Sequence, residues 1–215
     1  MSQTSAQAAP KTYVVEHLDP ELGPWSALEY ECIAKESAES GARFMLTSVP
    51  ATLRLPPNLA ALDSLHVEHR GVEEIFASQK ARVCLLDPAA SFELSPADGE
   101  RFDIFLFGGI LGDDPPRGMI HRTSELRMKG YVGRRLGPKQ MTTDTAVRVT
   151  RIVVEEKTPL DQIEWVDYPE LRINKHEATE MPFRYVKGKD GEPIMPTGMV
   201  ELIKKDADKG LEDLL

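Results

Sequence analysis

Two short, uninterrupted apolar runs constrain the fold of this chain more than any other feature. They are Val83–Leu86, which Asp87–Pro88 ends, and Ile104–Phe107, which Gly108–Gly109 ends. A strand with one solvent-facing side alternates apolar and polar residues, whereas a strand buried on both faces is apolar throughout. Such strands are typical of parallel sheets covered by helices. We therefore predict an α/β fold with a mainly parallel sheet flanked by helices.

The rest of the chain alternates between strand and helix patterns. Further strands are predicted at Tyr13–Val15, Phe44–Val49 and Glu164–Val166, and helices at Trp25–Glu39, Gln140–Val154 and Met199–Lys205. The segment Gln140–Val154 is rich in Thr and Val, which also suit a strand. A helix is favoured there because Thr142 or Thr143 can cap it and Asp144 would lie in its first turn.

The chain carries no internal repeat and no low-complexity linker, so we predict a single domain over residues 12–215. Residues 1–11 are mostly polar and small, and we predict that they form a disordered tail. They lack the basic start and apolar core of a secretory signal. No apolar run reaches the roughly 18 residues of a membrane span. The two cysteines, Cys32 and Cys84, fit neither a disulfide framework nor a zinc motif. Reduced cysteines are typical of the cytosol or nucleus, and we predict a cytoplasmic protein.

The charge of the chain excludes some partners and leaves others open. A formal net charge of −9 makes attraction of the whole chain to nucleic acid or to an anionic membrane unfavourable. The charge is uneven, however, because residues 115–151 hold nine basic side chains and two acidic ones. This basic stretch is either a solvated loop and helix face or a surface for an anionic cofactor group, RNA or a ribosome.

Two glycine-containing turns follow apolar runs and are candidates for ligand binding, because ligands of open α/β folds lie beyond the carboxyl ends of strands. The first turn, residues 107–116, has Gly108, Gly109 and Gly112, a spacing that does not fit the dinucleotide fingerprint G-x-G-x-x-G. The second turn, residues 134–145, leads into a predicted helix whose first N–H groups can hold a carboxylate or carbonyl group. Either turn can also be purely structural. The chain has no phosphate loop and no G-x-S-x-G nucleophile turn.

A third segment, residues 167–185, is polar yet contains Met, Phe and Tyr side chains, and we predict that it is mostly irregular. A long loop of this kind is usually functional or disordered. Within it, Glu177 and Glu180 are either a solvated pair or acceptors for a cationic substrate. His66 and His69 have the spacing of metal ligands, but no third ligand is evident, so we predict no metal site.

Five segments of the chain are long and unusual, namely ARVCLLDP, FDIFLFGGILGDDPPR, RRLGPKQMTTDTAVR, DYPELRINKHEATEMPFRYV and MVELIKKD. They closely resemble one group of the SPOUT (trefoil-knot) methyltransferases, and the resemblance extends from Thr12 to the end of the chain. That group includes a fungal protein arginine methyltransferase acting on a small-subunit ribosomal protein. It implies S-adenosylmethionine as cofactor and a C-terminal deep trefoil knot. It also implies a monomer that acts on a small-subunit ribosomal protein without requiring nucleic acid.

The resemblance further implies three cofactor-binding loops, at residues 108–113, 136–142 and 177–183. Backbone groups around Gly108–Gly109, Leu136 and Met141 would meet the adenine edge and the ribose, and Leu111 and Pro182 would pack on the adenine ring. The cofactor-binding residues predicted in this way are Phe107, Gly108, Gly109, Ile110, Leu111, Gly112, Leu136, Gly137, Gln140, Met141, Thr142, Met181 and Pro182.

Four carboxylates flank the predicted cofactor pocket, namely Asp113, Asp114, Glu177 and Glu180. Arginine is a difficult nucleophile because its pKa is about 12.5–13.8. An enzyme therefore needs carboxylates to hold the guanidinium, orient one nitrogen lone pair and accept a proton. The acidic rim favours a cationic substrate, and any of the four is a candidate base. An RNA methyltransferase of the same fold and a non-catalytic ribosome-binding protein are the alternatives.

Overall fold

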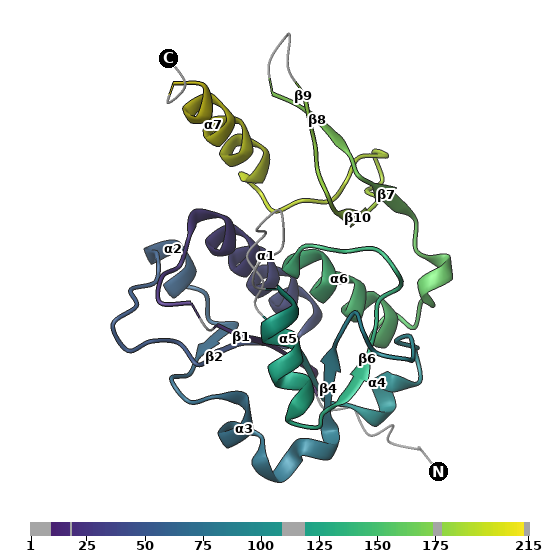
Figure 1. The fold of residues 1–215 in the computed structure, drawn as a ribbon. Coiled ribbons are helices and arrows are strands. Elements are labelled where there is room, and N and C mark those ends of the chain that lie inside the picture. Colours follow the sequence, from purple (N-terminus) through teal and green to yellow (C-terminus); the bar gives the residue numbers. More distant parts are fainter. Residues whose placement is uncertain (1–9, 18, 109–118, 174–177, 213–215) are drawn as a thin grey trace, which may run out of the picture.

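A computed structural model of the chain describes residues 10–17, 19–108, 119–173 and 178–212. At its centre lies a six-stranded sheet with the order β3-β2-β1-β5-β4-β6, and every neighbouring pair of its strands is parallel (Figure 1). Its strands are β1 (Thr12–Glu16), β2 (Arg43–Thr47), β3 (Leu65–Val67), β4 (Val83–Leu86), β5 (Ile104–Gly108) and β6 (Val132–Arg134). The predicted parallel sheet is confirmed.

Helices cover both faces of this sheet (Figure 1). One face packs against α1 (Pro24–Ser40) and α6 (Thr143–Val154), and the other against α3 (Val72–Ile75) and α5 (Met119–Met128). The remaining helical elements are α2 (Pro57–Ala60), α4 (Asp98–Arg101), α7 (Met199–Glu212) and the 3-10 helices η1 (Ala77–Arg82) and η2 (Leu160–Gln162). The three predicted helices are therefore present.

Two predicted boundaries were wrong for local reasons. The second strand ends at Thr47 instead of Val49, because Ser48 takes a φ of 56°, which is outside the extended region. Helix α6 begins at Thr143 instead of Gln140, and Thr142 is its N-cap residue with extended backbone angles. The residues before Thr142 are thereby left as a loop beyond the end of β6.

The continuous apolar runs are buried on both faces. Every residue of β4 and of β5 is buried. Phe105 and Phe107 join the cluster packed by α1 and α6, whereas Ile104 and Leu106 join the cluster on the side of α3 and α5. Full burial of such a side chain contributes about 1.5–3 kcal/mol. Burial on both faces is the reason that these segments show no apolar–polar alternation.

The segment predicted to be irregular, residues 167–185, instead forms short antiparallel strands. β7 (Trp165–Asp167) pairs with β10 (Arg184–Val186), and β8 (Glu170–Arg172) pairs with β9 (Ala178–Glu180). The prediction was wrong because three residues are too few to show strand periodicity. Figure 1 places these strands and α7 together, next to α1 and α6. Met181, Phe183 and Tyr185 are buried there, and Trp25 of α1 packs against them.

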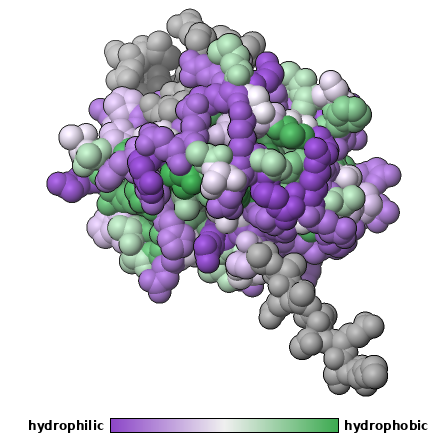
Figure 2. All heavy atoms as spheres, turned by 90° about the horizontal axis from the view of Figure 1, so that it is seen from below, coloured by the Kyte–Doolittle hydropathy of each residue, from purple (hydrophilic) through white to green (hydrophobic). Residues whose placement is uncertain are grey.

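The surface is mostly hydrophilic on the side seen from below Figure 1, where hydrophobic residues occur in small groups (Figure 2). The large hydrophobic side chains exposed among the described residues are Val67, Phe92, Met128 and Tyr168. Single exposed hydrophobic residues are normal on protein surfaces. No helix within the described ranges combines the length and the apolar character that a membrane span requires.

Candidate active site

The carboxyl ends of β1, β5, β4 and β6 lie side by side, as the strand order requires. Glu16 is the register partner of Gly108, and the Asp87 N–H donates to the Arg134 carbonyl oxygen at 2.8 Å. Strand β1 leads to β2 on one side, whereas β5 leads to β6 on the other, so the topological switch point lies between β1 and β5. Ligands of open parallel sheets bind at such a point.

Two of the predicted cofactor residues, Phe107 and Gly108, lie at this edge. The Phe107 side chain belongs to the hydrophobic core, so only its backbone can face a ligand. Gly108 is packed closely against α5, because a Cβ atom there would lie 3.2 Å from Thr123 Oγ1. The absence of a side chain at Gly108 thus lets α5 approach the end of β5. The predictions for Gly109, Ile110, Leu111 and Gly112 fall outside the described residues.

Five further predicted residues lie in the loop that joins β6 to α6, called here the β6–α6 loop (residues 136–142). Leu136 and Met141 are half-buried and pack against the main hydrophobic core. Within the described part of the chain, no hydrogen bond engages the backbone groups of Leu136, Gly137 or Met141. Gly137 has a φ of 89°, which a residue with a side chain adopts only with strain. The loop therefore presents unpaired backbone donors and acceptors beside apolar side chains.

An ion cluster from the neighbouring strands holds this loop in place. Asp167 of β7 accepts from Lys139 Nζ at 2.7 Å and from Arg184 Nε of β10 at 2.6 Å. The Arg184 N–H also donates to the Gln140 carbonyl oxygen at 2.8 Å. Hydrogen bonds from Arg184, and then from Lys139, lower the pKa of Asp167 to about 2. The middle of the β6–α6 loop is thereby fixed by residues that follow it in the chain.

Of the predicted third loop the structure describes residues 178–183, and the Arg184 N–H that follows them donates to the Gln140 carbonyl oxygen of the β6–α6 loop. Met181 is buried in the hydrophobic cluster with Phe183, whereas Pro182 is exposed. Glu180 is exposed on β9, directly opposite Glu170 of β8. The predictions for Asp113, Asp114 and Glu177 fall outside the described residues.

The basic stretch, residues 115–151, is largely neutralised. Each of its cations whose side chain the structure describes lies in an ion pair with a carboxylate. The pairs are Arg127 with Asp87, Lys129 with Glu73, Arg134 with Asp98, Arg135 with Glu93, Lys139 with Asp167, Arg148 with Glu36 and Asp144, and Arg151 with Glu36 and Glu156. The described cations are thus paired with carboxylates of the same molecule. They do not support the prediction of a surface for RNA or another anion.

A cavity of about 640 Å³ beside β4 and β6 contains residues that the sequence predictions missed. Its lining includes Leu85, Asp87, Ala89, Ala90, Ser91, Phe92, Arg101, Arg127, Tyr131, Val132, Gly133 and Arg134. Asp87 directly follows the apolar run of β4. The abrupt end of that run is the sequence signal that could have indicated this cavity. The lining contains none of the predicted cofactor-binding residues that the structure describes, so the cavity lies outside the candidate cofactor site.

The structure shows how the two histidines His66 and His69 lie. His66 is exposed on β3, and His69 Nδ1 lies 2.8 Å from the Val49 carbonyl oxygen. Across the described ranges, no three His, Cys, Asp or Glu side chains come together in a way that could hold a metal ion. Of the ligands suggested by the sequence, the described geometry best suits a small organic molecule held by backbone groups.

Comparison with known proteins identifies the family. A family model described as "Protein arginine N-methyltransferase SFM1-like" matches residues 12–210. The protein arginine N-methyltransferase SFM1 of Saccharomyces cerevisiae is 44% identical over 215 residues, covering 94% of this chain and 99% of the relative. The crystal structure of the yeast arginine methyltransferase SFM1 complexed with SAM has a TM-score of 0.81 at 43% identity, covering 92% of this chain and 91% of that one.

A more distant likeness concerns the fold alone. The structure of spTrm10 complexed with SAH has a TM-score of 0.51 at 13% identity, covering 69% of this chain and 91% of that one. Trm10 enzymes are SPOUT proteins, so the predicted fold class is confirmed, whereas the trefoil knot itself stays a prediction. The extent and identity of the first matches leave one conclusion: this chain belongs to the SFM1-like family of protein arginine N-methyltransferases.

Proposed function

We propose that this protein transfers a methyl group from S-adenosylmethionine to an arginine side chain of a small-subunit ribosomal protein. The observation that carries the proposal is the match to an arginine methyltransferase family over residues 12–210. We further propose that the protein acts as a monomer in the cytoplasm and does not require nucleic acid. The location rests on the two reduced cysteines, and the other finer points come from the resemblance of the sequence motifs.

The β6–α6 loop fits a cofactor of this kind. An adenine ring needs an apolar contact and a few hydrogen bonds to its edge. Leu136 and Met141 offer half-buried apolar side chains. The backbone groups of Leu136, Gly137 and Met141, which no hydrogen bond engages within the described residues, offer donors and acceptors. When bound, the cofactor supplies an electrophilic methyl group. The task left to the protein is to position this group against the substrate and to exclude water.

The substrate side of the reaction requires carboxylates. The guanidinium group must be held and oriented, and one proton must leave as the nitrogen gains a methyl group. Asp113, Asp114, Glu177 and Glu180 are our candidates for these roles. Glu180 and its cross-strand neighbour Glu170 are both exposed, and like charges directly opposite are unfavourable. A cationic substrate at β9 would relieve that repulsion.

The Glu180→Gln variant should test the role of this carboxylate. The amide keeps the size of the side chain but neither attracts the guanidinium nor accepts a proton. We expect kcat to fall about 100-fold, the scale of acid–base assistance, while affinity for S-adenosylhomocysteine stays within about twofold. Steady-state kinetics and isothermal titration calorimetry measure the two quantities. Glu192→Gln, which changes an exposed glutamate outside β8 and β9, is the control. An unchanged kcat for Glu180→Gln would remove Glu180 from the mechanism.

The Asp167→Asn variant should loosen the β6–α6 loop. The asparagine amide would offer one acceptor oxygen without charge, so Lys139 and Arg184 would lose their shared partner. We expect S-adenosylhomocysteine to bind about 3- to 10-fold more weakly, with a similar rise in KM for the cofactor. Because the Asp167 carboxylate loses its charge only as the pH falls toward about 2, the loss of affinity should be constant between pH 6 and 8.

Glu164→Gln is the control, since it breaks an exposed pair with Lys187. Equal affinities for wild type and Asp167→Asn would show that the ion cluster does not hold the loop.

The substrate class can be tested with labelled S-adenosylmethionine. The purified protein is incubated with the labelled cofactor and either ribosomal proteins or ribosomal RNA. We expect label in a protein of the small subunit and none in RNA. Label confined to RNA would favour the SPOUT RNA methyltransferase, and the absence of cofactor binding by calorimetry would favour a non-catalytic ribosome-binding protein.

A further inference from the structure

Two acidic side chains meet in the interior between α1 and α6. Glu29 of α1 and Asp144 of α6 are each 1% exposed. The Glu29 carboxyl group accepts the Thr143 backbone N–H at 3.1 Å and also bonds the Trp25 side chain. Thr143 is the first residue of α6, and its N–H has no partner within the helix. Glu29 therefore caps α6 from another helix.

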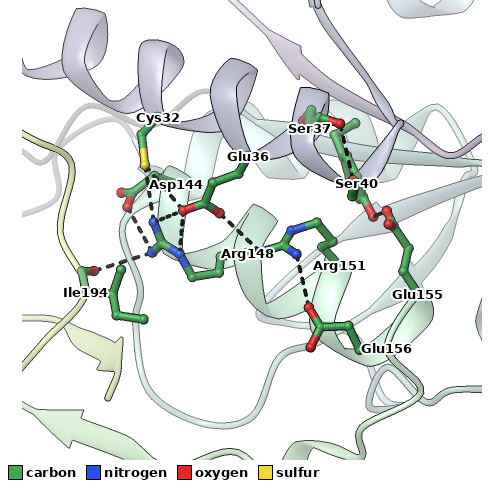
Figure 3. Close-up of polar contacts among 11 residues, drawn as sticks. Cys32, Glu36, Ser37, Ser40, Asp144, Arg148, Arg151, Glu155, Glu156 and Ile194 are labelled. Carbon is green, nitrogen blue, oxygen red and sulfur yellow. Dashed lines mark hydrogen bonds and ion pairs between the residues drawn. The ribbon is translucent and has the colours of Figure 1, made fainter. Parts of the chain in front are cut away.

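A buried arginine neutralises one side of this cluster. Arg148 of α6 is 3% exposed and lies 3.3 Å from Asp144 Oδ2. Its other guanidinium nitrogens donate to Glu36 Oε1 at 2.6 and 2.9 Å, and Cys32 lies beside them (Figure 3). The guanidinium thus bonds Asp144 and Glu36 but has no contact with Glu29 among the described residues. One carboxyl group of the buried cluster has no cation of its own.

The other oxygen of Asp144 indicates where a proton lies. Asp144 Oδ1 is buried, and no N–H or O–H group of the described residues donates to it. Its side chain is nevertheless within hydrogen-bonding reach of the Glu29 carboxyl group. Two carboxyl groups within hydrogen-bonding reach of each other in a dry interior cannot both be ionised. A proton between them supplies the donor that Asp144 Oδ1 lacks.

The electrostatic surroundings place this proton on Glu29. Burial and then the Asp144 charge raise the pKa of Glu29 well above its usual range. Burial raises the pKa of Asp144 as well, but Arg148 and hydrogen bonds with Thr142 and the Thr145 backbone favour its ionised form. With Glu29 neutral, the charges of Asp144 and Glu36 are matched by those of Arg148 and Arg151.

We propose that Glu29 is a positioning residue of the cofactor site. Glu29 shares a proton with Asp144 and is therefore uncharged. In this state it caps α6 and fixes the end of the β6–α6 loop. The loop ends at Thr142, immediately before the N–H that Glu29 holds. Met141, whose backbone groups we assign to the cofactor, lies two residues from that N–H. This inference rests on the proposed function only in its link to the cofactor, because the shared proton is a property of the fold.

The shared proton makes the stability of the fold depend on pH, because the proton is lost as the pH rises. The other titratable groups that face the pair within the described residues are Cys32 and Glu36 of α1, Arg148 of α6 and Tyr185 of β10. Burial keeps Cys32 and Tyr185 uncharged, since it raises the pKa of both above the ordinary range. A carboxyl group whose pKa is raised on folding contributes stability that is lost as the pH rises toward that pKa. The contribution of Glu29 to folding stability should therefore decline with pH above about 4.3, the usual pKa of glutamate.

The test compares the full-length wild type with Glu29→Gln, Glu29→Ala and the control Glu39→Gln, which changes an exposed glutamate of the same helix. Melting temperatures between pH 5 and 9 measure the shared proton without any cofactor. Calorimetric titration with S-adenosylhomocysteine over the same range measures the link to the site. Glutamine reproduces the uncharged carboxyl group, because its amide accepts from Thr143 and donates to Asp144.

We expect the melting temperature of Glu29→Gln to rise relative to wild type as the pH increases, and its affinity for S-adenosylhomocysteine to stay within about threefold. Glu29→Ala should bind about tenfold more weakly, the scale of a lost helix cap. A constant difference in melting temperature between wild type and Glu29→Gln would overturn the shared proton. Wild-type affinity in folded Glu29→Ala would overturn the positioning role. If wild type binds no S-adenosylhomocysteine, the proposed function fails, while the melting temperatures still decide on the proton.

Discussion

Replacement of Arg148 with methionine should lower the free energy of unfolding at pH 7 by about 3–5 kcal/mol. Methionine keeps much of the side-chain volume but leaves Asp144 and Glu36 without the cation that lies between them (Figure 3). Asp144 is fully buried, so water cannot take over the role of the guanidinium. The loss of the Arg148 bond to the Ile194 carbonyl oxygen should also release the segment before α7.

This loss should depend on pH. Without Arg148 the buried Asp144 can avoid an unpaired charge only by binding a proton, so its pKa in the folded variant rises. Stability gained from that proton is present at low pH and lost as the pH increases. The loss of unfolding free energy caused by Arg148→Met should therefore be smaller at pH 5 than at pH 7.

Urea unfolding at both pH values measures this loss. The control Arg70→Met, which removes an exposed ion pair with Glu68, should cost less than about 1 kcal/mol. A deficit below about 1 kcal/mol for Arg148→Met at pH 7 would contradict the account.

Replacement of Gly137 with valine should reduce kcat/KM for the cofactor by about 10- to 100-fold. The φ of 89° at Gly137 strains a β-branched residue by about 1–3 kcal/mol, and a shift of the β6–α6 loop relieves this strain. The backbone groups of Leu136 and Met141 would move with it. A displacement of about 1 Å in a positioning element can cost about 100-fold in rate.

A matched glycine separates the effect on the site from backbone strain. Gly191 has a φ of 90° in an exposed turn, and a Cβ atom there would meet nothing within 4 Å. Gly191→Val should lower the melting temperature about as much as Gly137→Val and leave the kinetics unchanged. Equal kinetic losses in the two variants would show that the β6–α6 loop has no special role.

The sequence predicted the long or strongly apolar elements and missed most of the short ones, although the predicted strand Glu164–Val166 corresponds to β7. β4 and β5 were recognised because burial on both faces leaves an unbroken apolar run. The strand β6 was not assigned, since Gly133 and Arg134 are two of its three residues and it pairs only along one edge. The hairpin of β8 and β9 was missed for the same reason of length. Such short segments become strands only because they pair with another strand in the folded structure.

The candidate site also contains one part that the sequence predicted and another that it did not. The motif around Leu136 and Met141 predicted the β6–α6 loop, which the structure places beside the carboxyl ends of the central strands. The pair of Glu29 and Asp144 left no trace in the sequence, because its members lie on different helices and neither occurs in a recognisable catalytic spacing. The ion pairs of the basic stretch were equally hidden. Contacts between distant residues arise from the packing of the fold, and no local pattern encodes them.

The central claim, methylation of an arginine side chain, is tested most directly by mass spectrometry of ribosomal proteins. Small-subunit proteins are isolated from cells that contain this enzyme and from cells that lack it, and the intact masses and fragment ions are compared. The account predicts that one small-subunit protein gains the mass of a methyl group on an arginine only when the enzyme is present, and that Gly137→Val reduces this gain. Identical protein masses in both cells, together with a methyl group that appears only in RNA, would contradict it.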